Sequence, residues 1–519
     1  MRLITFIIFS LLCFKGFTQK NFDLLNYLDF EPILNDIWGY TDTAGNEYAL
    51  VGLTTGVSIV KINNPDTTLL LHHVTGDSSL WRDIKVYNNY GYAVNEDGGG
   101  LLIMNFTQLP NILTYQYVTQ IGSYNFETAH NIFIDENGIA YLLGSNIANQ
   151  GAFMINLNTS NRFLPEFVGL YDDQYVHDAY ARGDTLYTAE LNNGTFSIID
   201  VSDKSNPIVL ARKTTGTNYT HNIWLSNDGK YVITTDEKSG AYVELYDISN
   251  LNNIKLIDKY RSSPSYGVIP HNAHFKGNYI FTSYYRDGLR LVDATLKHNL
   301  VEVGFYDSSP FNAAEGFEGN WGVYPYFSSG KIIISDREEG LFVLQPHYSR
   351  AAYLTGNVFD TLNNIPLNNA SVEIIGTSYI KETLYNGTYN IGVADSGYYD
   401  IRVTKPGCST VIKSNILLET AIEKVENFET KCINTGINDV NSDNYKAFFN
   451  TAGTLTIEYE GNKTITDIKI TDALGQTIKS IATNSKQFSV QYTKQLNVGI
   501  YFISLYSNNK IYTTKIIKS

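Results

Sequence analysis

Apolar and polar residues alternate along most of the chain, in short stretches bounded by glycine, asparagine or aspartate. Clear examples are Gly-Thr-Phe-Ser-Ile-Ile-Asp-Val at 194–201 and Gly-Leu-Arg-Leu-Val-Asp-Ala at 288–294. A period of two is typical of β-strands. The 39 Tyr and 26 Phe against 3 Met also favour strands over helical bundles. The pattern predicts an all-β protein, and 519 residues are more than a single core usually holds.

A unit of roughly 45 residues recurs seven times between residues 31 and 345. Each unit has an opening dipeptide, a strand, a turn, a second strand ending in acidic or polar residues, a third strand begun by glycine, and a weaker fourth strand. The opening dipeptides are Trp38-Gly39, Arg82-Asp83, His130-Asn131, His177-Asp178, His221-Asn222, His271-Asn272 and Trp321-Gly322. The glycines are Gly56, Gly100, Gly151, Gly194, Gly240, Gly288 and Gly340. Four short strands per unit are typical of a propeller blade, so residues 22–348 are predicted to form a seven-bladed β-propeller.

The seventh unit has no fourth strand of its own before Pro346. The segment 26–30, which precedes the first unit, has the fourth-strand pattern and belongs to no unit. We expect it to complete the last blade and close the ring, which removes an exposed sheet edge. A β-helix would need shorter rungs, and paired sandwiches would not repeat one period seven times.

The third strands that end in aspartate, above all 197–201 and 290–293, and the His-Asn openings resemble the LVIVD-repeat propellers of the choice-of-anchor B family. The resemblance covers the repeat region. It implies a surface-exposed bacterial propeller and brings no established chemistry.

The repeat stops after residue 352, and two smaller patterns follow. Residues 352–433 resemble the carboxypeptidase regulatory-like domain, which implies a small antiparallel β-sandwich that acts as a spacer or interaction module. Residues 437–519 contain a Gly-Ile-Tyr strand at 499–501 and end in Lys-Ile-Ile-Lys at 515–518. They resemble the type A C-terminal sorting domain of the type IX secretion system; a third structural sandwich is the alternative. The resemblance implies the type IX machinery as a partner and a secreted or cell-surface location, at the exterior of the outer membrane.

Residues 1–18 have a basic start, an apolar run from Ile4 to Phe14 and small residues before Gln19, which predicts a cleaved signal peptide. Cys13 raises the alternative of a lipoprotein, but Leu12 stands where lipoprotein signals carry a small residue. No other stretch is long enough for a transmembrane helix.

The net charge of −14 argues against nucleic acid and anionic membranes as partners and leaves room for divalent cations. Cys408 and Cys432 either pair or stay as two free thiols.

Four histidines share one position of the repeat: His130, His177, His221 and His271. Because the dipeptide begins the innermost strand, we expect their side chains to line one mouth of the central channel, with His274 close by. Converging with the strand-end acids Glu190, Asp236, Glu237 and Asp336, they would bind zinc, copper or manganese. The acidic turns at 95–98 and 336–339 suggest calcium, but their spacing misses the EF-hand pattern. The alternative is structural: the histidines bond the backbone or a neighbouring blade.

The sequence contains no Gly-x-Ser-x-Gly elbow, His-Glu-x-x-His pair or phosphate-binding loop. A non-enzymatic interaction module of adhesion type is therefore the favoured hypothesis. Its Tyr-rich loops at 283–286 and 324–327 would bind a glycan or a surface protein. The alternative is a metal-dependent enzyme, such as a hydrolase with a metal-bound water as nucleophile and Glu190 or Asp236 as base.

Overall fold

The structure is a computed structural model that describes residues 19–64, 67–264, 266–309, 311–362, 365–432, 445–449, 454–472, 476–493, 496–507 and 510–518. The predicted signal peptide, residues 1–18 with Cys13, lies outside the described residues. The described chain is nearly all β, as predicted. Its helical segments are three single 3-10 turns: η1 (Leu191–Asn193), η2 (Leu251–Asn253) and η3 (Tyr285–Asp287).

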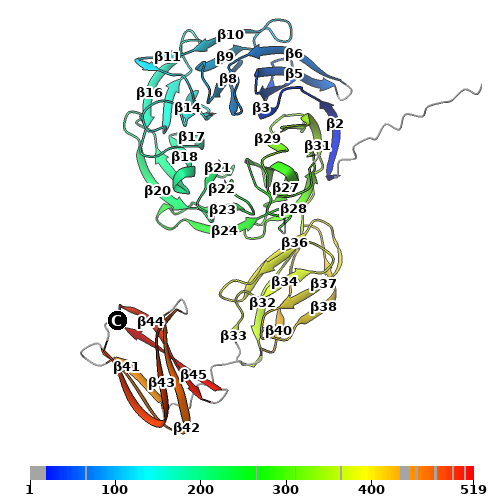
Figure 1. Cartoon of the computed structure of the whole chain (residues 1–519). Helices are drawn as coiled ribbons and strands as arrows, with labels where there is room; N and C mark the ends of the chain where they lie inside the picture. The colour runs from blue at the N-terminus through cyan, green and yellow to red at the C-terminus, as the bar shows by residue number, and fades with distance from the viewer. Residues whose placement is uncertain are drawn as a thin grey trace, which may run out of the picture.

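The repeat region forms a β-propeller, in which four-stranded antiparallel sheets follow one another around a ring (Figure 1). Within the described residues the ring contains seven sheets, six with four strands and one that a short N-terminal strand extends to five. The strands of the first three, from the ring axis outwards, are β3 (Leu34–Thr41), β4 (Glu47–Leu53), β5 (Gly56–Asn64) and β6 (Thr67–Thr75); β7 (Arg82–Tyr87), β8 (Tyr90–Asn95), β9 (Leu101–Asn105) and β10 (Thr114–Val118); and β13 (Asn131–Ile134), β14 (Ile139–Leu143), β15 (Ala152–Asn156) and β16 (Glu166–Tyr171). A short hairpin of β11 (Gln120–Ile121) and β12 (Tyr124–Asn125) precedes the third sheet.

The remaining four sheets keep the same order of strands. They are β17 (Asp178–Arg182), β18 (Thr185–Glu190), β19 (Thr195–Asp200) and β20 (Ile208–Thr214); β21 (Thr220–Leu225), β22 (Tyr231–Asp236), β23 (Val243–Asp247) and β24 (Lys255–Tyr260); β25 (Ala273–Lys276), β26 (Tyr279–Tyr284), β27 (Gly288–Asp293) and β28 (Val301–Tyr306); and β29 (Asn320–Tyr324), β30 (Ile332–Asp336), β31 (Gly340–Pro346) and β2 (Phe22–Leu28). We call these seven sheets blades 1 to 7 in chain order, with blade 7 completed by β2.

The N-terminal strand β2 is the outer strand of blade 7, and it runs antiparallel to β31 from Phe22 opposite Pro346 to Leu28 opposite Leu341. The structure therefore has the expected closure, with a strand that begins earlier than the predicted segment 26–30. The preceding β1 (Gln19–Lys20) pairs with β28, where Gln19 lies opposite Tyr306. The start of the described chain thus joins two neighbouring blades.

Blades pack face to face, so their inner strands are buried on both sides. All seven residues of β4 are buried, and the aromatic rings of Tyr48 and Phe106 share one cluster with Ile84 of the next blade. Such strands lose the polar face that a half-exposed sheet keeps, which explains their nearly continuous apolar runs.

Residues 352–432 form two facing sheets. One contains β32 (Ala352–Asp360), β33 (Ile365–Pro366), β36 (Thr388–Val393), β39 (Glu423–Val425) and β40 (Phe428–Thr430), and the other β34 (Ser371–Ile374), β35 (Ile380–Glu382), β37 (Gly397–Thr404) and β38 (Val411–Leu418). Alternate residues of β32 are buried, and one core joins Leu354 to Val372 and Ile401. The likeness to a carboxypeptidase regulatory-like domain stays a prediction.

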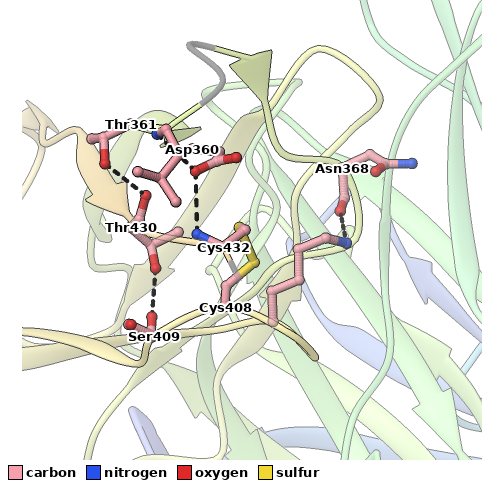
Figure 2. Close-up of a disulfide and its surroundings, with 9 residues drawn as sticks. Asp360, Thr361, Asn368, Cys408, Ser409, Thr430 and Cys432 are labelled. Atoms are coloured by element: carbon pink, nitrogen blue, oxygen red, sulfur yellow. Dashed lines mark hydrogen bonds between the residues drawn. A yellow bond between two sulfur atoms is a disulfide. The ribbon is translucent and has the colours of Figure 1, made fainter. Parts of the chain in front are cut away.

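Cys408 and Cys432 form a disulfide in this sandwich, with an S–S distance of 2.06 Å. Figure 2 shows the bond beside Asp360, whose carboxylate accepts a hydrogen bond from the Cys432 amide at 3.2 Å. On the same side, the Thr430 hydroxyl donates to the Ser409 carbonyl at 2.5 Å. Of the two states that the sequence left open, the structure has the paired one.

The sandwich contacts the outer part of blade 6 (Figure 1). Asp293 of β27 is fully buried and accepts hydrogen bonds from the Tyr353 hydroxyl at 2.6 Å and from the Ala351 amide at 2.9 Å. A second contact joins Lys381 to Asp258 at 2.9 Å. Because these contacts link side chains of both units, the sandwich packs directly on the propeller.

The last sheet has the order β41 (Tyr445–Phe449), β42 (Leu455–Asp472), β44 (Gly499–Ser507) and β45 (Lys510–Lys518), and β43 (Thr477–Tyr492) pairs with β42. Its core includes Ile457, Ile468 and Leu505, which are fully buried. The predicted Gly-Ile-Tyr and Lys-Ile-Ile-Lys motifs lie on the neighbouring strands β44 and β45.

Candidate functional site

The four repeat histidines lie in a row around one end of the propeller axis, as expected from their shared position. Ring centroids are 3.9 Å apart between His130 and His177, 4.3 Å between His177 and His221, and 4.4 Å between His221 and His271. They line one pocket, which we call the histidine pocket. Its other lining residues are Asp36, Trp81, Arg82, Asp83, Asn131, Asn272 and Trp321.

Backbone carbonyls determine the tautomers of two of these rings. His177 Nδ1 lies 3.1 Å from the carbonyl oxygen of His221, and His271 Nδ1 lies 2.6 Å from that of Trp321. A carbonyl only accepts, so Nδ1 carries the proton in both rings. In the neutral form, Nε2 of each ring then keeps a free lone pair. The structural role that was the alternative in the sequence is therefore real for these two rings, and it leaves Nε2 available.

The buried histidines are held neutral at neutral pH. Burial, with a smaller contribution from the neighbouring imidazoles, lowers the pKa of His177 and His271 well below the usual value. Burial also lowers the pKa of His221, although Glu237 opposes the shift. Nδ1 of His130 lies 2.6 Å from the carboxylate of the exposed Glu96.

Among the acids predicted as ligands, Glu237 approaches two of the pocket histidines. Its Oε1 lies 3.8 Å from Nε2 of His221 and 3.9 Å from Nε2 of His271, and it accepts a hydrogen bond from the Tyr285 hydroxyl at 2.5 Å. The three ligand atoms of His221, Glu237 and His271 all lie within 4.8 Å of one another. We call these three residues the His-Glu-His group.

Glu190, Asp236 and Asp336, the other three acids among the predicted ligands, are hydrogen-bonded to other groups. Glu190 accepts hydrogen bonds from the Tyr171 hydroxyl at 3.0 Å and the Ser197 hydroxyl at 2.7 Å. Asp236 accepts from the Thr215 hydroxyl at 2.7 Å. Both carboxylates are buried at the end of the second strand of a blade.

The strand-end acids have a repeated structural task. Tyr171 and Thr215 belong to the blade that precedes the acid they contact, and Ser308, which follows blade 6, donates to Asp336 of blade 7 at 2.8 Å. Each carboxylate thus holds the chain that leaves the previous blade. This is the physical reason for a strand-end acid in this repeat.

A ring of carboxylates and amides lies one residue deeper than the histidines. Asn222 donates to Asp178 at 2.7 Å, and its oxygen accepts from the Ala273 amide at 3.0 Å in the next blade. In blade 1, Asp36 has the role that Asn222 has in blade 5: its carboxylate accepts a hydrogen bond from the Ile84 amide of the next blade at 3.1 Å. The opening pair of that blade is therefore Asn35-Asp36, and the predicted Trp38-Gly39 was wrong.

β3 has a register irregularity between Leu34 and Ile37, at the observed pair, as β21 and β29 have at theirs. Trp38 lies instead at a deeper level of the axis, where its ring centroid is 6.4 Å from that of His274. His274 does not line the histidine pocket either but a second pocket beside it, with Trp38 and Trp224. Its ring lies 4.2 Å from that of Trp224, and burial lowers its pKa to about 3.

The Tyr-rich loops expected to bind a partner are part of the core. Tyr284 and Tyr285 are 0% and 1% exposed, and Phe327 is 2% exposed. Four exposed aromatic rings lie in the loops that lead into the histidine pocket: Trp81, Tyr266, Phe311 and Phe317. Other exposed rings, such as those of Tyr115, Tyr385 and Tyr398, lie elsewhere in the chain.

Comparison with known proteins identifies one part of the chain. Residues 451–519 match the family model of the secretion system C-terminal sorting domain. None of the curated proteins matches the chain. Among solved structures, the β-propeller domain of Cps50 (Swd1) from Myceliophteria thermophila is similar at 9% identity, covering 62% of this chain and 99% of that chain with a TM-score of 0.44.

The sorting domain indicates that the protein is secreted or displayed at the cell surface, and that it interacts with the type IX secretion machinery. Within the described part of the chain, no helix has the length and apolar character needed to cross a membrane.

Proposed function

We propose that the protein is an interaction module of adhesion type, exported by the type IX system, that binds a cell-surface glycan or protein at the propeller face around the histidine pocket. The observation that carries the proposal is the position of the exposed aromatic rings. Tyr266 and Phe317, 63% and 49% exposed, lie in the loops that lead from one blade to the pocket residue of the next, and Trp81 lines the pocket itself.

One of these rings, that of Phe317, is connected to the pocket through Tyr285, whose ring lies 4.9 Å from that of His271. The ring of Phe317 lies 5.3 Å from that of Tyr285, which is bonded to Glu237. The guanidinium of Arg286 lies 5.2 Å from the ring of Phe311 and is paired with Glu318 at 2.7 Å. Aromatic rings beside fixed polar groups offer a broad contact area at little entropic cost, which suits sugar rings or a protein surface.

The test is binding of the purified full chain to arrays of glycans and of bacterial surface proteins. A triple variant, Trp81→Ala, Tyr266→Ala and Phe317→Ala, is expected to lose at least about tenfold in affinity, because central aromatic contacts dominate interfaces. The matched control removes three equally exposed apolar residues from outer strands of the blades: Leu69→Ala, Ile208→Ala and Leu256→Ala. Equal binding by both triple variants, or no binding by the parent chain, would refute the proposal.

A metal-dependent enzyme at the same pocket is the second candidate function. It is favoured by the His-Glu-His group, since two imidazoles and one carboxylate form a ligand set that leaves a position open for water. Glu190 and Asp236 do not serve as its base, because their carboxylate oxygens accept hydrogen bonds from Tyr171 and Thr215 of the preceding blade. Hydrolysis of ester, phosphoester or peptide substrates that depends on added zinc would support this function over simple binding.

A further inference from the structure

We infer that His221, Glu237 and His271 form a binding site for one divalent transition metal ion of the zinc class. The site would use Nε2 of each histidine and Oε1 of Glu237. This inference needs neither proposed function, although the enzymatic candidate would depend on it.

The first argument is the chemistry of the three atoms. His271 donates from Nδ1 to the Trp321 carbonyl, so its Nε2 presents a lone pair toward Glu237. The separations of 3.8 Å and 3.9 Å are longer than a hydrogen bond, so no proton is shared between either imidazole and the carboxylate. The lone pair of His271 Nε2 and the Glu237 carboxylate thus converge, and His221 completes the ligand set when its proton lies on Nδ1, which has no hydrogen-bond partner among the described residues.

The second argument is distance. Zinc bonds of about 2.0–2.1 Å place tetrahedral ligand atoms roughly 3.3–3.4 Å apart. The two distances from Glu237 Oε1 exceed this by about half an ångström, and all three ligand atoms lie within 4.8 Å of one another, so side-chain rotations have to bring them closer.

The third argument is the support around the ligands. The Trp321 carbonyl orients the His271 ring, and the Tyr285 hydroxyl orients the Glu237 carboxylate at 2.5 Å. Metal sites in proteins generally have such outer partners, which fix the tautomer and the direction of each ligand. Both histidine side chains are almost fully buried, so their positions are restricted before any ion binds.

Soft and borderline ions fit this set better than calcium. Imidazole nitrogen suits zinc, copper and nickel, whereas calcium takes six to eight oxygen ligands. The site has one carboxylate from Glu237. Three protein ligands are also the number found where zinc keeps an open position for water.

The experiment is a titration of the full chain with zinc, and with cobalt as a spectroscopic probe. The protein is purified without chelators and without a polyhistidine tag. One equivalent of zinc is expected to bind, with cobalt giving the visible absorption of a site with nitrogen ligands. His221→Ala and His271→Ala should each weaken binding by at least about 100-fold, and Glu237→Gln by about 10-fold or more.

The matched control is His130→Ala, which removes a histidine from the same row but not from the His-Glu-His group. It should change zinc affinity by less than about threefold. If an alanine variant fails to fold, Glu237→Gln keeps the side-chain size and gives the same comparison. Absence of binding to the parent chain, or equal loss in His130→Ala, would overturn the inference.

The outcome is separable from the proposed functions. Metal binding is measured without any partner, and the array experiment is repeated with zinc-loaded and zinc-free protein. A site that binds zinc while the arrays stay silent would support the metal inference and refute the adhesion proposal.

Discussion

Phe22 tests whether the N-terminal strand closes the propeller. Its side chain is 2% exposed in the cluster that also contains Val303 and Leu344, from blades 6 and 7. Removing a fully buried phenylalanine side chain costs about 3–5 kcal/mol, because the transferred apolar area is lost and a cavity remains. Phe22→Ala is therefore expected to destabilise the closed ring by about 4 kcal/mol.

The effect on Tm follows from the size of the propeller. The unfolding entropy of about 325 residues between Phe22 and Pro346 is roughly 0.7 kcal/mol/K, so about 4 kcal/mol lowers the Tm of the propeller by about 6 °C. Differential scanning calorimetry measures this shift. Leu24→Ala is the control on the same strand, because Leu24 is 41% exposed and its truncation should cost below about 0.5 kcal/mol.

Two results would refute the reasoning. One is an unchanged propeller transition in Phe22→Ala, since it would mean that β2 does not contribute to the packed ring. The other is an equal shift in both variants, which would show that the strand responds to truncation without regard to burial. Amide hydrogen exchange of β31 gives a second measurement, because loss of β2 exposes the backbone groups that β31 bonds.

Three further outcomes are expected. Replacing Cys408 and Cys432 with serine should cost the sandwich about 3.5 kcal/mol, because the bond closes a loop with a sequence separation of 24; chemical denaturation measures the loss, and no change under oxidising conditions would contradict it. Burial raises the pKa of Asp336 to about 7, so the folded state holds a proton that the unfolded state releases between about pH 4 and pH 7. The free energy of unfolding should thus fall as pH rises through that window, by up to about 4 kcal/mol, and Asp336→Asn should flatten the fall. Deleting 451–519 should leave the protein in the periplasm on cell fractionation, whereas His130→Ala should still be exported.

The sequence predicted the ring and the row of histidines because both follow from a repeat. Equivalent positions in equivalent units meet equivalent surroundings, so four histidines at one position had to lie side by side once the blades formed a circle. Their spacing of 3.9–4.4 Å between neighbouring centroids agrees with this reasoning.

The acidic partner of the histidines was harder to predict. Asp236 and Glu237 are adjacent, and successive side chains of an extended chain point to opposite sides. Asp236 ends β22 and turns to Thr215, so Glu237 turns to the pocket. The choice between them depends on where the strand ends, and a pattern of residue types does not contain that position.

In several blades, the glycine at the start of the third strand lies against the outer strand of the same blade. A Cβ on Gly151 would lie 1.9 Å from the carbonyl oxygen of Tyr171, and one on Gly288 would lie 2.3 Å from that of Tyr306. In both blades the oxygen belongs to the last residue of the outer strand, so only glycine allows the two strands to pair at this point.

Gly340 of blade 7 makes the same kind of close contact, but with a strand from the N-terminal end of the chain. Its Cβ would lie 2.4 Å from the carbonyl oxygen of Leu28, the last residue of β2. The seventh unit thus keeps the glycine that its outer strand requires, although that strand comes from the start of the chain. Without β2, blade 7 would have no outer-strand carbonyl beside Gly340, and a larger residue would fit there. The glycine at 340 and the N-terminal strand β2 therefore depend on each other in closing the ring.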